Sequence, residues 1–253
     1  MIPTELVVVM YIYVFFLGAI LGSFANVVIC RVPRKESFVR TRSHCDSCGY
    51  QLRWFDLVPL FSFIFFKGRC RKCKAKISVQ HFLIEVLNGL LYVFVFYMYG
   101  FTVETVIFSL LGTTLFALSM IDFKTYEIPV GFQYVIAVLG IIRIAFDYTN
   151  WLSYCIGFFA VSVFLLILYY ATKGAAIGGG DVKLMAVSGL LLGWQLNILA
   201  FFIGCILGSV IHVIRMKVTK EGHVLAMGPY LSAGIMISLF WGQKFLDWYL
   251  SSF

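Results

Sequence analysis

The sequence predicts an all-α polytopic membrane protein of about eight transmembrane helices, with a small zinc-binding module between the first two. Three observations lead to this prediction. Hydrophobic residues make up 61% of the 253 residues, apolar runs of about 20 residues recur, and two Cys-x-x-Cys pairs lie in one long polar stretch. Soluble domains contain about 45–50% apolar residues, so an ordinary soluble fold is excluded.

The apolar runs define the expected helices, because about 20 residues of helix cross the hydrocarbon core of a bilayer. The first run is not a cleavable signal peptide, since its basic residues (Arg31, Arg34 and Lys35) follow the apolar stretch and do not precede it. The expected helices are 5–30, 82–99, 101–121, 130–146, 152–171, 182–199, 200–214 and 229–250.

The basic residues indicate the orientation of these helices. Segments 31–81, 122–129, 172–181 and 215–228 lie on one side of the membrane and hold 17 of the 20 Lys and Arg residues. Loops rich in Lys and Arg face the cytoplasm, so we expect the N-terminus to lie outside. The net charge of +8 then reflects orientation and contact with anionic lipid, and nucleic acid is not an expected partner.

Segment 31–81 is expected to be a cytoplasmic module between a first transmembrane helix, 1–30, and a membrane domain, 82–253. About fifty residues bury little core without a cross-link. The spacing of Cys45, Cys48, Cys70 and Cys73 fits a structural zinc site with four thiolate ligands. Disulfides, an iron centre or a redox pair are the alternatives, but cytosolic thiols are kept reduced.

Polar residues within the first two helices allow two interpretations. Gly18 and Gly22 form a small-xxx-small pattern that permits close helix contact, and Ser23 and Asn26 lie on one helix face. These residues either join helices or line a site. His81 and Glu85 also share a face and are either a satisfied pair at the headgroup boundary or part of a binding site.

Two aspartates lie at the same end of separate expected helices. Asp122 ends the third helix, and Asp181 follows three glycines (Gly178, Gly179 and Gly180) at the start of the sixth. Carboxylates in a membrane are costly and indicate function. The glycines are expected to break the helix and leave an unwound stretch where an extended substrate could lie. Two carboxyl groups at one water cannot both ionise easily, and they suit aspartic-protease chemistry.

These motifs resemble the type IV prepilin peptidases, which are aspartic proteases with a G-x-G-D sequence. The resemblance runs nearly end to end. It is carried by Leu21-Gly22-Ser23-Phe24 with Asn26, Arg31, Pro33, the two cysteine pairs with Gly68, Glu85, Asp122 with Ile128-Pro129, Gly178-x-Gly180-Asp181-Val182-Lys183-Leu184, and Gly228-Pro229-Tyr230. Many members have an acidic residue after Ile-Pro, whereas Val130 stands here.

The resemblance implies an enzyme of the bacterial cytoplasmic membrane that removes leaders from prepilins and pseudopilins at the cytoplasmic face. It implies Asp122 and Asp181 as the catalytic pair and the four cysteines as ligands of one zinc ion per chain. It also implies methylation of the new N-terminus with S-adenosylmethionine, although no glycine-rich cofactor loop is present to identify the residues that bind it.

Two other functions fit part of the pattern. Paired carboxylates and glycine-broken helices also occur in ion- or proton-coupled transporters, but no inverted repeat is visible and both aspartates lie at one face. A scaffold with a partner-binding zinc module leaves the aspartate pair unexplained.

Overall fold

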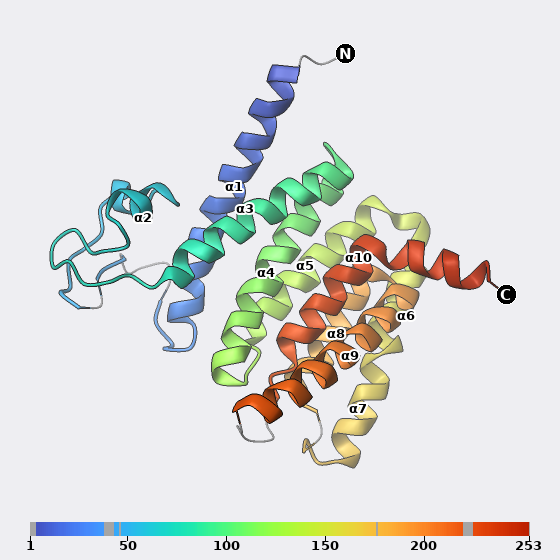
Figure 1. Cartoon of the computed structure of the whole chain (residues 1–253). Coiled ribbons are helices and arrows are strands. Elements are labelled where there is room, and N and C mark those ends of the chain that lie inside the picture. Colours follow the sequence, from blue (N-terminus) through green and yellow to red (C-terminus); the bar gives the residue numbers. More distant parts are fainter. Residues whose placement is uncertain (1–3, 38–42, 46, 176, 220–224, 253) are drawn as a thin grey trace. The chain divides into compact units, whose positions relative to one another are not determined.

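The computed structural model describes residues 4–37, 43–45, 47–175, 177–219 and 225–252 (Figure 1). Its elements are all helices within these ranges, apart from two isolated β-bridges, His44 with Gln51 and Arg69 with Lys76. The predicted all-α class is therefore confirmed. The chain packs as two compact units, Met1–Thr113 and Thr114–Phe253, and α4 (Val103–Thr125) contributes to both.

The first unit is built on the contact between α1 (Thr4–Arg31) and α3 (Val79–Tyr99). Added Cβ atoms at Gly18 and Gly22 would lie 2.8 Å from Tyr92 and 3.0 Å from Asn88, so the two backbones approach closely. The small-xxx-small pattern is a packing seam, which is how close helix pairs form in membranes.

Buried amides cross this seam. The side-chain amide of Asn88 donates to the carbonyl of Gly18 (2.7 Å), and that of Asn26 donates to the carbonyl of His81 (3.0 Å). The Thr113 hydroxyl of α4 donates to the side-chain oxygen of Asn88 (2.9 Å). Asn26 therefore joins α1 to α3, as the first of its two interpretations predicts.

The second unit surrounds α8 (Gly179–Leu192). This helix contacts five others, and eight of its fourteen residues are buried, so it forms the centre of the unit. Its neighbours are α5 (Val130–Phe146), α6 (Trp151–Ala160), α7 (Ser162–Ala171), α9 (Trp194–Thr219) and α10 (Gly228–Leu250).

Two glycines and an asparagine hold α8 in the centre of this unit. A Cβ on Gly189 would overlap the carbonyl oxygen of Gly157, so α6 and α8 touch through their backbones. Beside this crossing, the Asn197 amide of α9 donates to the carbonyls of Gly157 and Met185, both at 3.0 Å. Its oxygen accepts from the Ser188 hydroxyl at 2.9 Å, so this fully buried amide is satisfied.

The structure corrects two expected helix boundaries. Helices 182–199 and 200–214 were expected, but α8 ends at Leu192 and α9 begins at Trp194, because Gly193 has a left-handed φ of 76°. The expected helix 152–171 is divided at Val161 into α6 and α7. Next to this break the Ser162 hydroxyl donates to the Phe158 carbonyl, a bond that bends helices.

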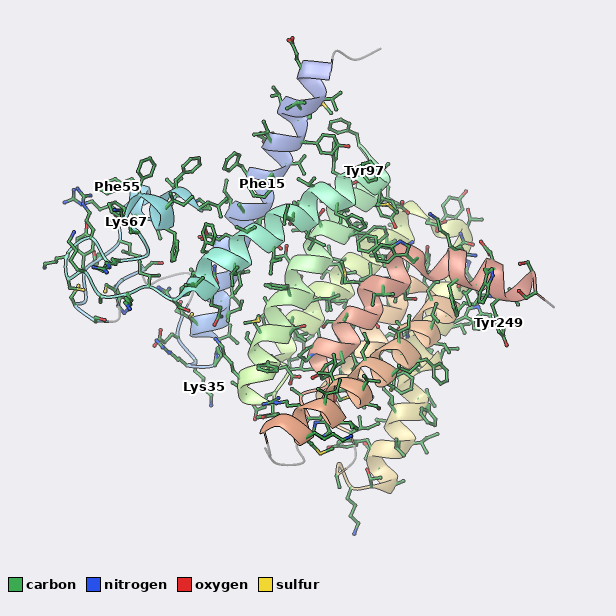
Figure 2. The ribbon with its side chains drawn as sticks, viewed as in Figure 1. Phe15, Lys35, Phe55, Lys67, Tyr97 and Tyr249 are labelled. Atoms are coloured by element: carbon green, nitrogen blue, oxygen red, sulfur yellow. The ribbon has the colours of Figure 1, made fainter. Side chains whose placement is uncertain are left out.

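Among the residues that the structure describes, five helical stretches are long and apolar enough to cross a membrane: Glu5–Arg31, Val79–Tyr99, Val103–Thr125, Tyr148–Ala171 and Trp194–Lys217. Helix α5 is apolar but shorter. Apolar side chains project outward along the helices, and Tyr97 is 71% exposed (Figure 2). A surface of this kind suits lipid contact. The total of eight spans stays a prediction.

Candidate functional site

Asp122 lies in the last turn of α4 and is only 4% exposed. Its Oδ2 accepts a hydrogen bond of 2.8 Å from the backbone N–H of Gly228, the first residue of α10. The first N–H groups of a helix have no partner within the helix and attract negative charge. Asp122 therefore caps α10 from a distant position in the chain.

Gly228 permits this contact because it has no side chain. A Cβ at this position would lie 2.7 Å from Oδ2 of Asp122, which is closer than real Cβ atoms approach. The next residue, Pro229, has no N–H group and is well suited to the first turn of a helix. The Gly-Pro start of α10 thus presents one N–H group to the carboxyl group and leaves room for it.

Asp181 lies in the first turn of α8, and Gly178 is the N-cap residue of that helix. The carboxyl group turns back to accept a hydrogen bond from the backbone N–H of Gly178. A Cβ on Gly178 would lie 3.0 Å from Oδ2 of Asp181. The helix begins at Gly179, so the expected unwound stretch over all three glycines is wrong and only Gly178 is extended.

Gly180 brings a second segment close to Asp181. A Cβ on Gly180 would lie 3.0 Å from Cβ of Ile128, in the stretch that leads into α5. The buried amide of Gln133 in α5 donates to the carbonyl of Gly180 (3.2 Å). The start of α8 is therefore held from the side by α5.

Asp122 and Asp181 lie in the same compact unit, and Asp122 is close enough for its charge to act on Asp181. Lys124 and Lys183 are exposed, as expected for residues two positions from each aspartate. The unit thus holds two carboxyl groups at helix ends, each fixed by a backbone N–H group. Two carboxyl groups within reach of one water molecule share a proton and can activate that water.

The four cysteines of the module form one cluster whose sulfur atoms all lie within 4.8 Å of one another. The two Cys-x-x-Cys turns have the same hydrogen bonds. Gly49 N–H donates to the Cys45 carbonyl (2.9 Å) and Lys74 N–H to the Cys70 carbonyl (3.0 Å). Gly49 and Lys74 both have a left-handed φ, 68° and 62°. This repeated turn aims the four sulfur atoms at a common point.

The cluster suits a tetrahedral metal ion. Cys45 Sγ and Cys73 Sγ are 3.8 Å apart, and four sulfurs at about 2.3 Å from zinc lie about 3.8 Å from one another. The seven cysteines are free thiols. Backbone N–H groups of Cys73 and Lys72 lower the pKa of the Cys70 thiol to about 6.

The pKa of Cys73 moves in the opposite direction. The backbone N–H of Ala75 lowers it, but desolvation and hydrogen bonds with Cys48, Cys70 and Cys45 outweigh that contact and raise the pKa to about 11. Closely spaced thiols do not all ionise easily, because the negative charges repel one another. A cation bound among them would favour the thiolate form.

Three further polar contacts were not predicted from the sequence. They are Gly228 N–H to Asp122, Gln133 to Gly180, and the backbone N–H of Leu60 to Glu85 Oε2 (2.8 Å). Through the last of these contacts, Glu85 links α3 to the module. The Gly-Pro start of α10 was visible as a helix start, but nothing in the sequence shows which carboxyl group it meets.

Asp122 is buried and Asp181 is half-buried. Carboxyl groups at helix ends in an apolar helical fold are typical of membrane-embedded enzymes and transporters. Comparison with protein families distinguishes these classes. The model of the bacterial Peptidase A24 N-terminal domain matches residues 16–99, and that of the type IV leader peptidase family matches residues 108–213. The chain belongs to the type IV leader peptidase family and is a peptidase, so the transporter interpretation is not favoured.

Curated relatives carry the name prepilin leader peptidase/N-methyltransferase. One from Myxococcus xanthus is 32% identical over 214 residues, which cover 82% of this chain and 64% of that protein. A relative from Stutzerimonas stutzeri is 29% identical, and the matched residues cover 92% of this chain and 91% of that protein. A relative from Bacillus subtilis is 28% identical, and the matched residues cover 93% of this chain and 96% of that protein. No solved structure gives a significant match.

Proposed function

We propose that this protein is an aspartic endopeptidase that removes the leader peptide from type IV prepilins and pseudopilins at the cytoplasmic face of the membrane. The observation that carries the proposal is the pair Asp122 and Asp181, two carboxyl groups that interact within one unit and are each held by a backbone N–H group. The names of the relatives supply the substrate class.

In the proposed mechanism one aspartate is ionised and its partner carries a proton. The ionised carboxylate takes a proton from water, and the oxygen of that water adds to the scissile carbonyl carbon. The protonated carboxyl group donates its hydrogen to the carbonyl oxygen. As the C–N bond breaks, the carboxyl group that took the proton from water gives it to the leaving nitrogen. The other carboxylate takes a proton from a hydroxyl of the tetrahedral intermediate, which becomes the new carboxyl group of the leader. One aspartate is then ionised and the other protonated, as at the start.

Zinc binding and a second activity, methylation, also form part of the proposal. Cys45, Cys48, Cys70 and Cys73 hold one zinc ion, which cross-links the module and has no open position for chemistry. The enzyme then methylates the new N-terminal amine with S-adenosylmethionine, as the relatives' names suggest. Mass spectrometry of a processed pilin tests the methylation. An unmethylated N-terminus in the presence of ample S-adenosylmethionine would contradict it.

Substitution of each aspartate tests the peptidase mechanism. Asp122→Asn and Asp181→Asn should each reduce leader removal from a co-expressed prepilin to background, because neither amide can exchange a proton with water. Asp247→Asn is the matched control, since Asp247 is an exposed carboxylate on α10. Cleavage that survives either active-site substitution, in protein that accumulates in the membrane, would disprove the mechanism.

A further inference from the structure

The short helix α2 (Phe61–Phe65) of the cysteine module has an unusual surface for a segment between two transmembrane helices. None of its residues is buried, and Phe65 and Ile64 are 77% and 61% exposed. Large apolar side chains on so short a helix are costly in water and favourable at a membrane interface.

Helix α2 also lies against the apolar parts of its neighbours. The Phe61 ring stacks on Phe16 of α1 with the ring centroids 5.7 Å apart, and the Phe63 ring stacks on Phe82 of α3 at 5.1 Å. Helix α2 therefore packs two of its aromatic rings against α1 and α3, while Ile64 and Phe65 stay exposed.

A hydrogen bond also joins the module to α3. Leu60, directly before α2, has a left-handed φ of 65°, and its N–H donates to Glu85 in the second turn of α3. This bond is buried and satisfies an N–H group that would be costly to leave unpaired in an apolar region. The start of α2 is thus fixed to α3 by this bond and to α1 by the ring contact of Phe61.

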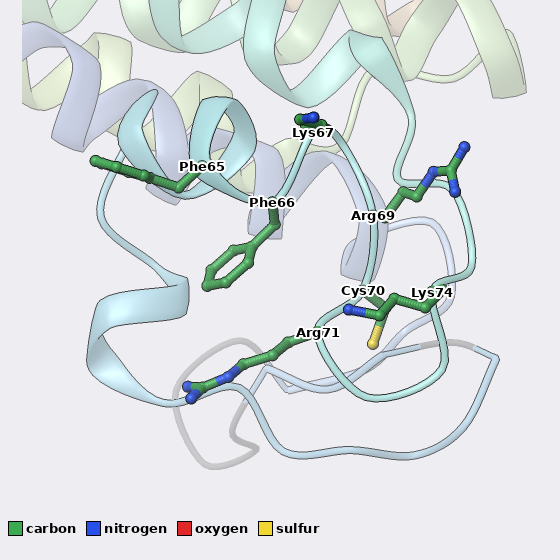
Figure 3. Close-up of a pocket in the computed structure, with 7 residues that line it drawn as sticks. All are labelled: Phe65, Phe66, Lys67, Arg69, Cys70, Arg71 and Lys74. Atoms are coloured by element: carbon green, nitrogen blue, oxygen red, sulfur yellow. The ribbon is translucent and has the colours of Figure 1, made fainter.

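A basic cavity begins where the chain leaves α2 (Figure 3). Its volume is about 560 Å³, and its lining residues are Phe65, Phe66, Lys67, Arg69, Cys70, Arg71 and Lys74. Four of these seven residues are cationic and none is acidic. The guanidinium of Arg71 lies over the Phe55 ring, 4.9 Å from its centroid, which orders one of the cations.

We propose that this cavity binds the phosphate headgroup of an anionic phospholipid, with the lipid tails along the exposed face of α2. The apolar helix and the cations meet at Phe65 and Phe66, as a lipid's tails and phosphate meet at its glycerol. Basic residues near an anionic membrane surface favour such lipids, and an amphipathic segment adds apolar contact. The module is thereby fixed to the membrane surface by lipid as well as by protein.

The test measures lipid binding to the full-length protein in a neutral detergent by native mass spectrometry. Phosphatidylglycerol should bind more tightly than phosphatidylcholine, and inorganic phosphate should not displace it. Lys67→Gln with Lys74→Gln should weaken phosphatidylglycerol binding about thirtyfold, as expected for two charges near a membrane surface. The matched control is Lys72→Gln with Lys76→Gln, which removes the same charge from exposed positions outside the cavity.

Metal content of each purified variant shows whether the module is folded. In folded variants, equal loss of affinity in the two double substitutions would show charge attraction without a site and overturn the proposal. Equal binding of phosphatidylcholine, or displacement by inorganic phosphate, would overturn it as well. These readouts do not depend on leader cleavage, so the proposal can fail while the peptidase function stands.

Discussion

At the scale of single residues, each of the two aspartates depends on a glycine, which lies 106 residues after Asp122 in one case and three residues before Asp181 in the other. Gly228 lies against Asp122, and Gly178 lies against Asp181. In each case the glycine supplies a backbone N–H group and leaves the space that a side chain would occupy. The geometry of the carboxyl groups is therefore determined as much by missing side chains as by those present.

The substitution Gly228→Ala should reduce leader cleavage by about a hundredfold, because the new Cβ would meet Oδ2 of Asp122 at 2.7 Å and displace it. Cleavage rates in isolated membranes, normalised to the amount of enzyme, measure the effect. The control is Gly131→Ala, because a Cβ at Gly131 would meet nothing within 4 Å. Equal rates for the two variants would show that Asp122 tolerates displacement.

Prediction at the residue scale had a clear limit. Asp122 and Asp181 could be proposed as site residues because carboxylates are rare and costly in apolar helices. The roles of Gly228 and Gln133 could not, because each depends on a contact with a distant segment. Gly228 is 106 residues from Asp122, and Gln133 is 47 residues from Gly180. Neither residue carries a local signal that names its partner.

At the scale of elements, the cysteine module combines a repeated turn with a cluster of four thiols. The spacing of the cysteines predicted the cluster because each Cys-x-x-Cys turn brings two sulfurs together. The sequence did not reveal α2 or the bond from Leu60 to Glu85, since a five-residue helix has no usable periodicity. One segment of the module, α2, lies against α1 and α3.

The purified protein should contain about one zinc ion per chain, and Cys70→Ser should remove it. Zinc binds thiolates, so protons compete with it. Backbone N–H groups hold the pKa of the Cys70 thiol below its usual range, so retention of zinc should be complete at neutral pH and should fall as the pH becomes acidic. Elemental analysis after dialysis at each pH measures this.

Cys155→Ser, which changes a single cysteine in α6, is the control and should keep the metal. Full metal content in Cys70→Ser would show that the cluster is not the zinc site. Metal content that rises as the pH falls would also contradict the proposal, since protonated thiols bind zinc poorly.

The hydrophobic pattern of the sequence predicts the presence of helices better than it predicts where each helix begins and ends. Runs of apolar residues identified the helical stretches because a bilayer requires long apolar segments. The break at Val161 follows from a side-chain hydroxyl that bonds to the preceding turn, and the end of α8 follows from the backbone angle of Gly193. Both boundaries depend on local features that a uniformly apolar hydropathy pattern does not reveal.

At the scale of the whole molecule, the distribution of basic residues predicts the orientation in the membrane. With 17 of the 20 Lys and Arg residues in four alternating segments, the positive-inside rule places those segments in the cytoplasm. The five long apolar stretches agree with a multi-pass membrane protein, while the shorter helices α5 and α8 leave the number of crossings open to test.

Eight crossings place both ends of the chain outside the cytoplasm. Alkaline phosphatase fused after residue 252 should therefore be active, since this enzyme folds only outside, and a fusion within segment 122–129 should be inactive. A fluorescent protein that folds only in the cytoplasm should give the reverse result at both positions. An inactive phosphatase at the C-terminus would show an odd number of crossings.

The cap of α10 on Asp122 has a consequence for biosynthesis. Domains form in the order in which the ribosome makes them, and Gly228 is made 106 residues after Asp122. Until the last helix enters the membrane, the carboxyl group of Asp122 lacks the N–H group that orients it. The newly made chain is therefore expected to stay inactive while it is inserted, so that cutting begins only when synthesis is nearly complete.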